Sequence, residues 1–224
     1  MKSINLHVLL SVLIFSCDKT DHIDKLPCNY IDFKYYNDEP YPLGEMSGDY
    51  ILFGSDSSNS DKSIRDYIKS KNYFNHYFDF EIYKLNRYKY KYGILKLSKT
   101  CSCDEITWIL DDLEQNQVID YAHFTIQTDD CTNLFWEPIG DLCVNSYSNI
   151  FYVKVKDTID ISDLNTTLLE TNTWIREQNQ FRHETYSIYA DKSSKGDALE
   201  MANYFHETGL FEYSEPDIIK IVVE

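Results

Sequence analysis

An internal repeat is the feature that most restricts how this chain can fold. Residues 105–122 align without a gap on residues 197–214. Both segments have apolar residues at the i, i+3, i+4, i+7 spacing of an amphipathic helix, namely Ile106, Ile109, Leu110 and Leu113 in the first and Ala198, Met201, Ala202 and Phe205 in the second. Each helix is followed by a stop, with Gly209 suited to a left-handed cap, and then by a short apolar strand. Two copies of one structural unit are therefore predicted.

The same order of elements continues upstream of each helix. First strands are predicted at 50–53 and 150–155, where β-branched and aromatic residues gather. First helices follow behind the capping residues Ser60 and Asp160. A hairpin over 80–97 and a weaker counterpart in 181–190 complete each copy.

The predicted order is βαββαβ, twice, which is the split βαβ or ferredoxin-like order. The predicted fold class is therefore α+β: two tandem ferredoxin-like βαββαβ units, each an antiparallel sheet with helices on one face. The two uncovered sheet faces could pair with each other or could both remain open to a partner. The resulting division of the chain is 1–16 signal peptide, 17–29 lipidated cysteine and tether, 30–46 hairpin turning at Asn37 and Asp38, 47–127 first unit, 128–148 connector, and 149–224 second unit.

The start of the chain indicates export. A basic residue, Lys2, precedes an apolar run over 4–15 that is too short to span a bilayer as an ordinary helix. The pair Ser16–Cys17 resembles the lipobox of bacterial lipoproteins, although Phe15 is bulkier than the usual residue there. We expect Cys17 to be acylated and the chain to be anchored to the membrane of a bacterial cell envelope, at the outer membrane or cell surface. The alternative is ordinary secretion with a free Cys17.

Charge and cysteines limit the possible partners. A formal net charge of −16 repels nucleic acid phosphates, so a nucleic-acid partner is disfavoured. Five cysteines remain beside Cys17, and an exported protein can form disulfides. Their odd number leaves one unpaired, and the spacing of Cys131 and Cys143 allows a disulfide-closed loop. No histidine lies at ligand spacing beside them, so no metal site is predicted.

No catalytic motif occurs in the chain. It has no Gly-x-Ser-x-Gly elbow, no glycine-rich phosphate loop and no His-Glu-x-x-His. Neighbouring polar pairs such as His206–Glu207 and Asp111–Asp112 are typical of solvated helix positions. We therefore expect a protein that is not an enzyme, with no catalytic residue and no cofactor.

Residues 198–217, from Ala198 to Asp217, resemble the end of the N-terminal prodomain-like region of bacterial, often lipid-anchored, subtilisin-like serine peptidases. Looser matches extend over most of 30–217, and include 35–43, 94–97, 118–122 and 151–156. The resemblance implies a ferredoxin-like fold, in agreement with the periodicity. It also implies a sheet that packs on two surface helices of a peptidase. The peptidase domain itself is absent from this sequence.

The resemblance implies roles for the last part of the chain. Glu212, Glu215 and Asp217 would cap helix N-termini of the peptidase, and residues 218–224 would lie in its substrate cleft, with Ile221, Val222, Val223 and Glu224 as contact residues. The alternative is that the carboxylates are ordinary strand-end charges and the tail is one more paired strand. The expected function is a stand-alone inhibitor or folding helper of a subtilisin-like peptidase; the alternatives are a surface lipoprotein that binds another ligand and a truncated remnant.

Overall fold

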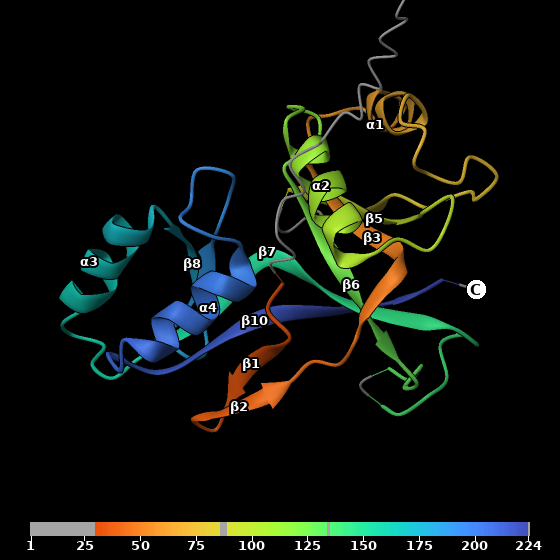
Figure 1. Cartoon of the computed structure of the whole chain (residues 1–224). Coiled ribbons are helices and arrows are strands. Elements are labelled where there is room, and N and C mark those ends of the chain that lie inside the picture. Colours follow the sequence, from red (N-terminus) through yellow and green to blue (C-terminus); the bar gives the residue numbers. More distant parts are fainter. Residues whose placement is uncertain (1–29, 86–88, 134, 224) are drawn as a thin grey trace, which may run out of the picture.

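The computed structural model describes residues 30–85, 89–133 and 135–223 (Figure 1). Four of the expected features lie outside the described residues: the signal peptide, the lipidated Cys17, the tether and Glu224. None of the helices in the described part is long and apolar enough to cross a membrane.

The elements follow the predicted order. The N-terminal hairpin consists of β1 (Phe33–Tyr36) and β2 (Glu39–Pro42). The first unit comprises β3 (Met46–Asp56), α1 (Asp61–Lys69), β4 (Tyr83–Leu85), β5 (Tyr90–Lys96), α2 (Cys103–Glu114) and β6 (Tyr121–Thr128). The second comprises β7 (Cys143–Val155), α3 (Ser162–Thr171), β8 (Trp174–Gln178), β9 (Thr185–Tyr189), α4 (Ala198–Glu207) and β10 (Phe211–Val222).

The strand order is the same in both units. It runs β4-β5-β3-β6 in the first and β8-β9-β7-β10 in the second, with antiparallel pairing throughout. In each unit the first strand is therefore central and the last strand lies beside it, which is the ferredoxin-like arrangement. The fold class predicted from the repeat is confirmed.

One ladder joins the two units. The end of β6 pairs with the start of β7, from Ile126↔Asn145 to Thr128↔Cys143. The strands of both units therefore belong to a single eight-stranded sheet. This joint exists because β7 begins at Cys143, inside the segment predicted as a connector. The sequence also missed β8, a short strand directly after α3 whose exposed and charged side chains hide the period of two.

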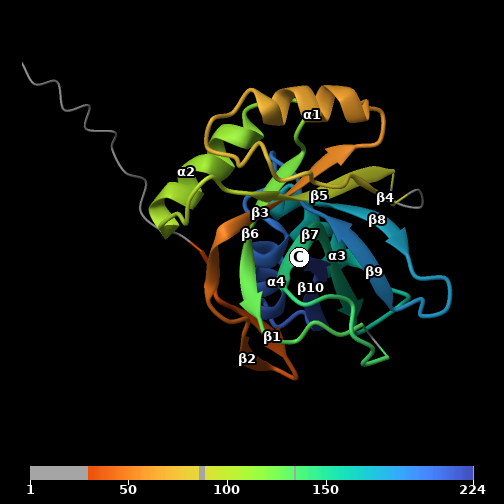
Figure 2. The ribbon, with the colours of Figure 1, turned by 90° about the vertical axis from the view of Figure 1, so that its right-hand side faces the viewer.

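The local sequence explains where the helices begin. Ser102 caps α2 and Glu105 completes a capping box; Asp197 and Glu200 do the same for α4. Figure 1 shows α1 and α2 beside the strands of the first unit and α3 and α4 beside those of the second, and Figure 2 shows α1 and α2 on the outer side of the first unit. Between helices and sheet lies the main core, with fully buried Phe53, Ile64, Leu113, Phe151 and Phe205.

The face of the first sheet away from its helices is covered by the second unit. Leu52, Ile94 and Tyr121 of that face pack in one apolar cluster with Val144 of β7 and Ile221 of β10. Of the two uncovered faces predicted from the sequence, the first is therefore closed within the chain.

The N-terminal hairpin packs on the second unit, although the first unit follows it in the sequence. Its turn has left-handed backbone at Asn37 and Asp38, as a two-residue hairpin turn requires. The ring of Tyr35 stacks on His206 of α4 with centroids 4.0 Å apart, and Lys34 forms an ion pair with Glu215 of β10 at 2.6 Å.

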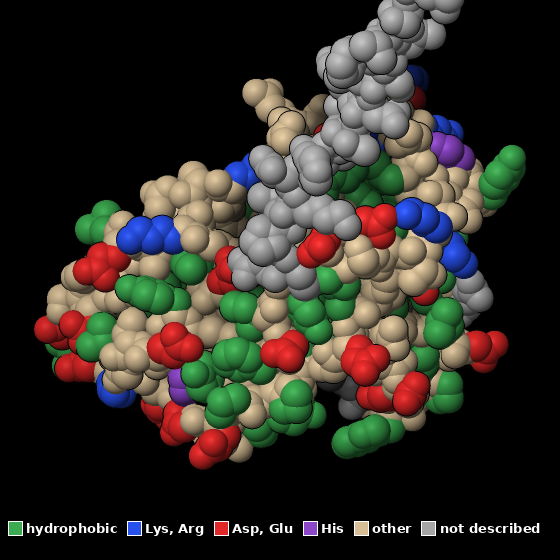
Figure 3. Space-filling model, viewed as in Figure 1, with side chains coloured by type: hydrophobic (Ala, Val, Ile, Leu, Met, Phe, Trp, Pro, Cys, Tyr) green, Lys and Arg blue, Asp and Glu red, His purple; other side chains and the backbone are tan. Residues whose placement is uncertain are grey.

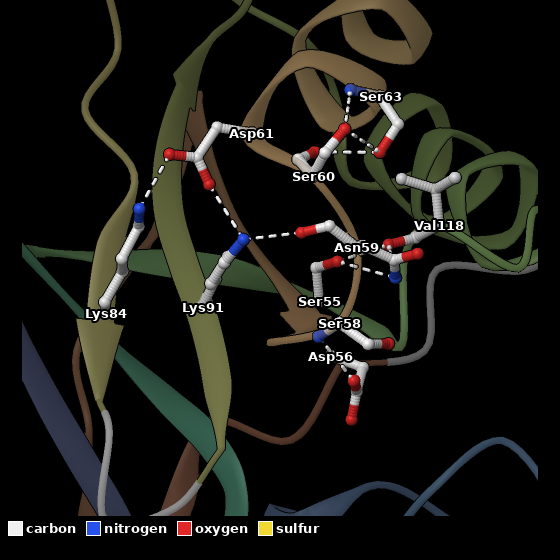
Figure 4. A network of polar contacts seen from close by, with 10 residues as sticks. All are labelled: Ser55, Asp56, Ser58, Asn59, Ser60, Asp61, Ser63, Lys84, Lys91 and Val118. Atoms are coloured by element: carbon white, nitrogen blue, oxygen red, sulfur yellow. Dashed lines mark hydrogen bonds and ion pairs between the residues drawn. The ribbon is translucent and has the colours of Figure 1, made fainter.

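A polar network around Lys91 secures the start of α1 (Figure 4). Lys91 is 7% exposed; its ammonium group donates to the carbonyl oxygen of Asn59 and lies 2.8 Å from a carboxylate oxygen of Asp61. Lys84 pairs with the other oxygen of Asp61 at 2.9 Å. Hydrogen bonds from these two lysines lower the pKa of Asp61 to about 2. The charges of this network are paired with one another, so we interpret it as structural.

We expect Lys91→Ala to lower the free energy of unfolding by about 1–3 kcal/mol at neutral pH, because it leaves the Asn59 carbonyl without its donor and Asp61 with Lys84 alone. The matched control is Lys62→Ala, which removes an exposed i,i+4 ion pair with Asp66 on the same helix and should cost less than about 0.5 kcal/mol. Urea unfolding measures both. Because the pKa of Asp61 is lowered in the folded state, the contribution of the pair is present at neutral pH and is lost as the pH falls toward about 2. Equal stability of the two variants would contradict the structural role.

Candidate functional site

The segment expected to be a free C-terminal tail is part of the sheet. β10 pairs with β7 along its whole length, from Phe211↔Val155 to Val222↔Cys143, and the amide of Val223 donates to the carbonyl of Leu142. Ile221 and Val223 are each only 6% exposed. The expectation of a tail free to enter a substrate cleft is therefore corrected, and the alternative of one more paired strand describes these residues. The physical reason is that their apolar side chains are buried against Leu52 and Ile94 of the first unit.

The three carboxylates expected to bind a peptidase all have partners within the chain. Glu212 pairs with Lys154 at 2.7 Å and Glu215 with Lys34 at 2.6 Å; their side chains remain 55% and 31% exposed. Asp217 accepts hydrogen bonds from Ser148 at 2.8 Å and from Tyr152 at 3.4 Å.

Burial raises the pKa of Asp217, and these two hydrogen bonds only partly offset that effect. Asp217 is thus half-buried and hydrogen-bonded within the chain. Glu212 and Glu215 are the more accessible of the three carboxylates.

A hollow of about 550 Å³ lies beside these carboxylates, on the face of the second sheet away from its helices. We call it the β10 hollow, and its lining residues are Tyr152, Asn179, Arg182, Thr185, Tyr213, Glu215, Pro216, Asp217 and Ile218. It combines tyrosine faces with carboxylates and one guanidinium. Such a surface can receive a side chain or helix end that carries both apolar and positively charged groups. The sequence analysis named Glu215 and Asp217 and predicted strand structure within 181–190, but it did not predict that β9 and the loop before it lie beside these carboxylates and complete the hollow.

A second concave region lies between the two units, and no sequence signal pointed to it. It has a volume of about 300 Å³. Its lining brings together carboxylates from both units, namely Asp111, Glu114, Asp120, Asp191, Asp197 and Glu200. We call it the acidic cleft. Burial raises the pKa of Glu114 to about 7 and that of Asp120 to about 6.

The carboxylates of the acidic cleft do not converge on one point. Among the described residues no group of three or more His, Cys, Asp or Glu side chains is placed to hold a metal ion. The buried His123 contributes its ring to the cleft lining, and its Nδ1 is hydrogen-bonded to the Tyr147 carbonyl at 2.7 Å. Burial lowers the pKa of this imidazole. Burial thus favours the neutral forms of all three groups, the protonated carboxyls of Glu114 and Asp120 and the unprotonated imidazole of His123.

The cysteines are distributed as follows. A disulfide joins Cys131 and Cys143, whose Cα atoms are 5.5 Å apart. Cys103 is also disulfide-bonded, which the sequence analysis did not foresee, and Cys101 is free and buried. The described part of the loop closed at Cys131 and Cys143 lies at the end of β6 and the start of β7 (Figure 1), where Val222 of β10 pairs with Cys143.

The fold and site together define, in the described residues, a two-unit ferredoxin-like α+β protein with a hollow beside its last strand. Comparison with known proteins adds little to this class. No family model matches the chain, and no curated protein matches it. One similar solved structure is the acetolactate synthase small subunit from Thermotoga maritima, at 10% identity, covering 77% of this chain and 95% of that one with a TM-score of 0.29. A likeness this weak carries no functional conclusion.

We expect Ile221→Ala to destabilise the protein by about 2–4 kcal/mol, because the lost side chain leaves a cavity between β10 and the first unit. Ile218→Ala, on the same strand but 36% exposed, is the matched control and should cost less than about 1 kcal/mol. Thermal or urea unfolding distinguishes the two. Wild-type stability of Ile221→Ala would contradict the burial of this segment.

The acidic cleft generates a prediction about pH. The folded-state pKa values of Glu114 and Asp120 exceed those of ordinary carboxyls, so the stability associated with their protonated forms is lost as the pH rises through about 6 and 7. We expect the free energy of unfolding to fall by roughly 1–3 kcal/mol between about pH 4.5 and about pH 7.5. Glu114→Gln should flatten this decrease, whereas Glu170→Gln on the exposed face of α3 should not. An unchanged slope in Glu114→Gln would rule out this carboxyl as its source.

Proposed function

We propose that this chain is a non-catalytic exported lipoprotein that binds a subtilisin-like serine peptidase, as an inhibitor or folding helper, through the β10 hollow. The peptidase as partner comes from the resemblance of residues 198–217. The choice of surface comes from the structure. The observation that supports it is a sheet face left uncovered by helices, with accessible carboxylates beside it on the last strand.

Accessibility favours the second unit over the first. The uncovered face of the first sheet is buried against Val144 and Ile221, so it cannot receive a partner without separating the units. The β10 hollow has Tyr152 and Tyr213 in its lining, and tyrosines contribute much of the energy of protein interfaces. A stable complex needs about 800 Å² of surface from each partner, so the docking area must extend beyond the hollow itself.

The charges of this surface fit a helix N-terminus or a basic side chain. Glu212 and Glu215 are held at the surface by Lys154 and Lys34. The pair of Glu212, whose side chain is 55% exposed, contributes little to folding, so a partner can replace Lys154 at small cost; the pair of Glu215 with Lys34 is half-buried and costs more to replace. Acidic side chains are scattered over the face seen in Figure 3, and the formal net charge of −16 would attract a basic partner over longer distances.

One observation favours the alternative, a surface lipoprotein that binds another ligand or a remnant without a peptidase partner. Each of the three predicted carboxylates already has a partner within the chain, which is what ordinary strand-end charges would show. Titration decides between the two functions. Residues 18–224, which include every described element, are added to a subtilisin-like peptidase while cleavage of a small peptide substrate is followed; saturable binding or inhibition supports the proposal, and its absence, or digestion of the protein, favours the alternative.

We expect the double variant Glu212→Gln, Glu215→Gln to weaken peptidase binding by about tenfold or more, because it removes both accessible carboxylates of the surface. The control is Asp157→Asn, Glu170→Gln, which removes the same charge from exposed positions elsewhere in the second unit. Dissociation constants from the inhibition titration provide the comparison. Equal weakening in both variants would indicate a general charge effect, and unchanged affinity in the first would contradict the proposed surface.

A further inference from the structure

The loop closed by Cys131 and Cys143 exposes aromatic side chains. Phe135 is 78% exposed and Trp136 84% exposed. Exposed large apolar side chains scattered singly are normal on a protein surface. These two are adjacent on one projecting loop, and Ile139 and Leu142 of the same loop are 37% and 43% exposed. We call residues 131–133 and 135–143 the aromatic loop.

Covalent and hydrogen-bonded contacts restrain the described residues of the aromatic loop. The disulfide closes its base, and a β-bridge joins Thr132 to Pro138. At the tip, the side-chain oxygen of Asn133 accepts hydrogen bonds from the amides of Phe135 and Glu137 at 2.8 and 3.1 Å. Trp136 has a φ of 58°, a strained conformation for a residue with a side chain. A rigid tip loses little conformational entropy when it binds.

The loop continues the surface of the β10 hollow. Ile218 lines the hollow, and Lys220, two residues further along β10, faces the same side of the strand because no register shift separates them. Lys220 pairs with Asp130 at 2.6 Å and donates to the carbonyl of Thr132 at 3.0 Å, which attaches the loop to the strand. Two strand residues span roughly 7 Å, so hollow and loop lie within the reach of one protein interface.

The charge of the loop restricts what can bind there. Residues 131–143 contain no lysine or arginine but include Glu137 and Asp141. Anionic lipid headgroups would be repelled, and a second copy of this acidic chain would be repelled as well. A protein pocket with apolar walls and basic residues at its rim is complementary to two aromatic side chains flanked by carboxylates.

We propose that Phe135 and Trp136 form the apolar anchor of the surface whose polar part is the β10 hollow, and that they insert into an apolar, basic-rimmed pocket of the same partner peptidase. This inference rests on the proposed function and extends it. Buried tryptophans are common energetic centres of interfaces. The loop would supply the contact area that the hollow alone lacks.

The test is the same inhibition titration, with residues 18–224 and the same subtilisin-like peptidase. Phe135→Ser, Trp136→Ser should weaken binding by about tenfold or more without changing the melting temperature. Asn133→Ala, which keeps both rings but removes the acceptor at the tip, should cause a smaller loss. The control is Tyr77→Ser, Leu169→Ser, which removes two side chains that are 100% and 84% exposed away from this surface, and it should bind like the wild type.

The outcomes separate this inference from the proposed function. If the wild type binds the peptidase and the loop variant binds it equally well, the inference alone is overturned. The same holds if the control variant loses as much affinity as the loop variant. No wild-type binding overturns the proposed function and this inference together. Loop-dependent sedimentation with phosphatidylcholine vesicles, combined with loop-independent peptidase binding, would instead assign the tip to a lipid surface and would also overturn it.

Discussion

The pairing of β7 with β10 is the constraint on which the rest of this structure depends. Along its outer half, the ladder from Phe211↔Val155 completes the second ferredoxin-like unit. In the half of the ladder that ends at Val222↔Cys143, the same two strands pack against the sheet of the first unit and bury Ile221 against Leu52. One pair of strands thus belongs to one unit and covers the other. The units cannot separate without exposing this apolar cluster to water.

The packing of the two units also determines where carboxylates lie close together. Carboxylates of α2 and of the loop before α4 line the same acidic cleft, where burial raises the pKa of Glu114. Several lysines are meanwhile used internally, since Lys34, Lys91 and Lys220 all form ion pairs within the chain. Each of these pairs neutralises one carboxylate too, so the acidity of the molecule comes from its formal net charge of −16, which makes basic partners the ones that electrostatics favours.

The candidate surface could be predicted only in part. Glu212 and Glu215 were found through a resemblance that marks positions along the chain, and the structure leaves both accessible beside a hollow. The same resemblance marked Asp217, which instead accepts hydrogen bonds from Ser148 inside the protein. Neither the hollow nor the aromatic loop's place beside it was predicted, because both depend on side chains from β9, β10 and the loop that lie far apart in the sequence.

Apart from the short strand β8, the sequence by itself determined the elements of the units and their order. Helix periodicity, capping residues such as Ser102 and Asp197, and the alternation of apolar residues in strands act over a few neighbouring positions. The sequence also indicated the Cys131–Cys143 loop, a matter of short spacing. Only the tertiary structure decided that β7 extends back to Cys143 to join β6, that the hairpin packs on α4, and that residues 218–223 are a buried strand and not a tail. The pattern of apolar residues in a segment shows that one of its faces must be buried. It does not show which surface buries that face, because that surface is formed by distant parts of the chain.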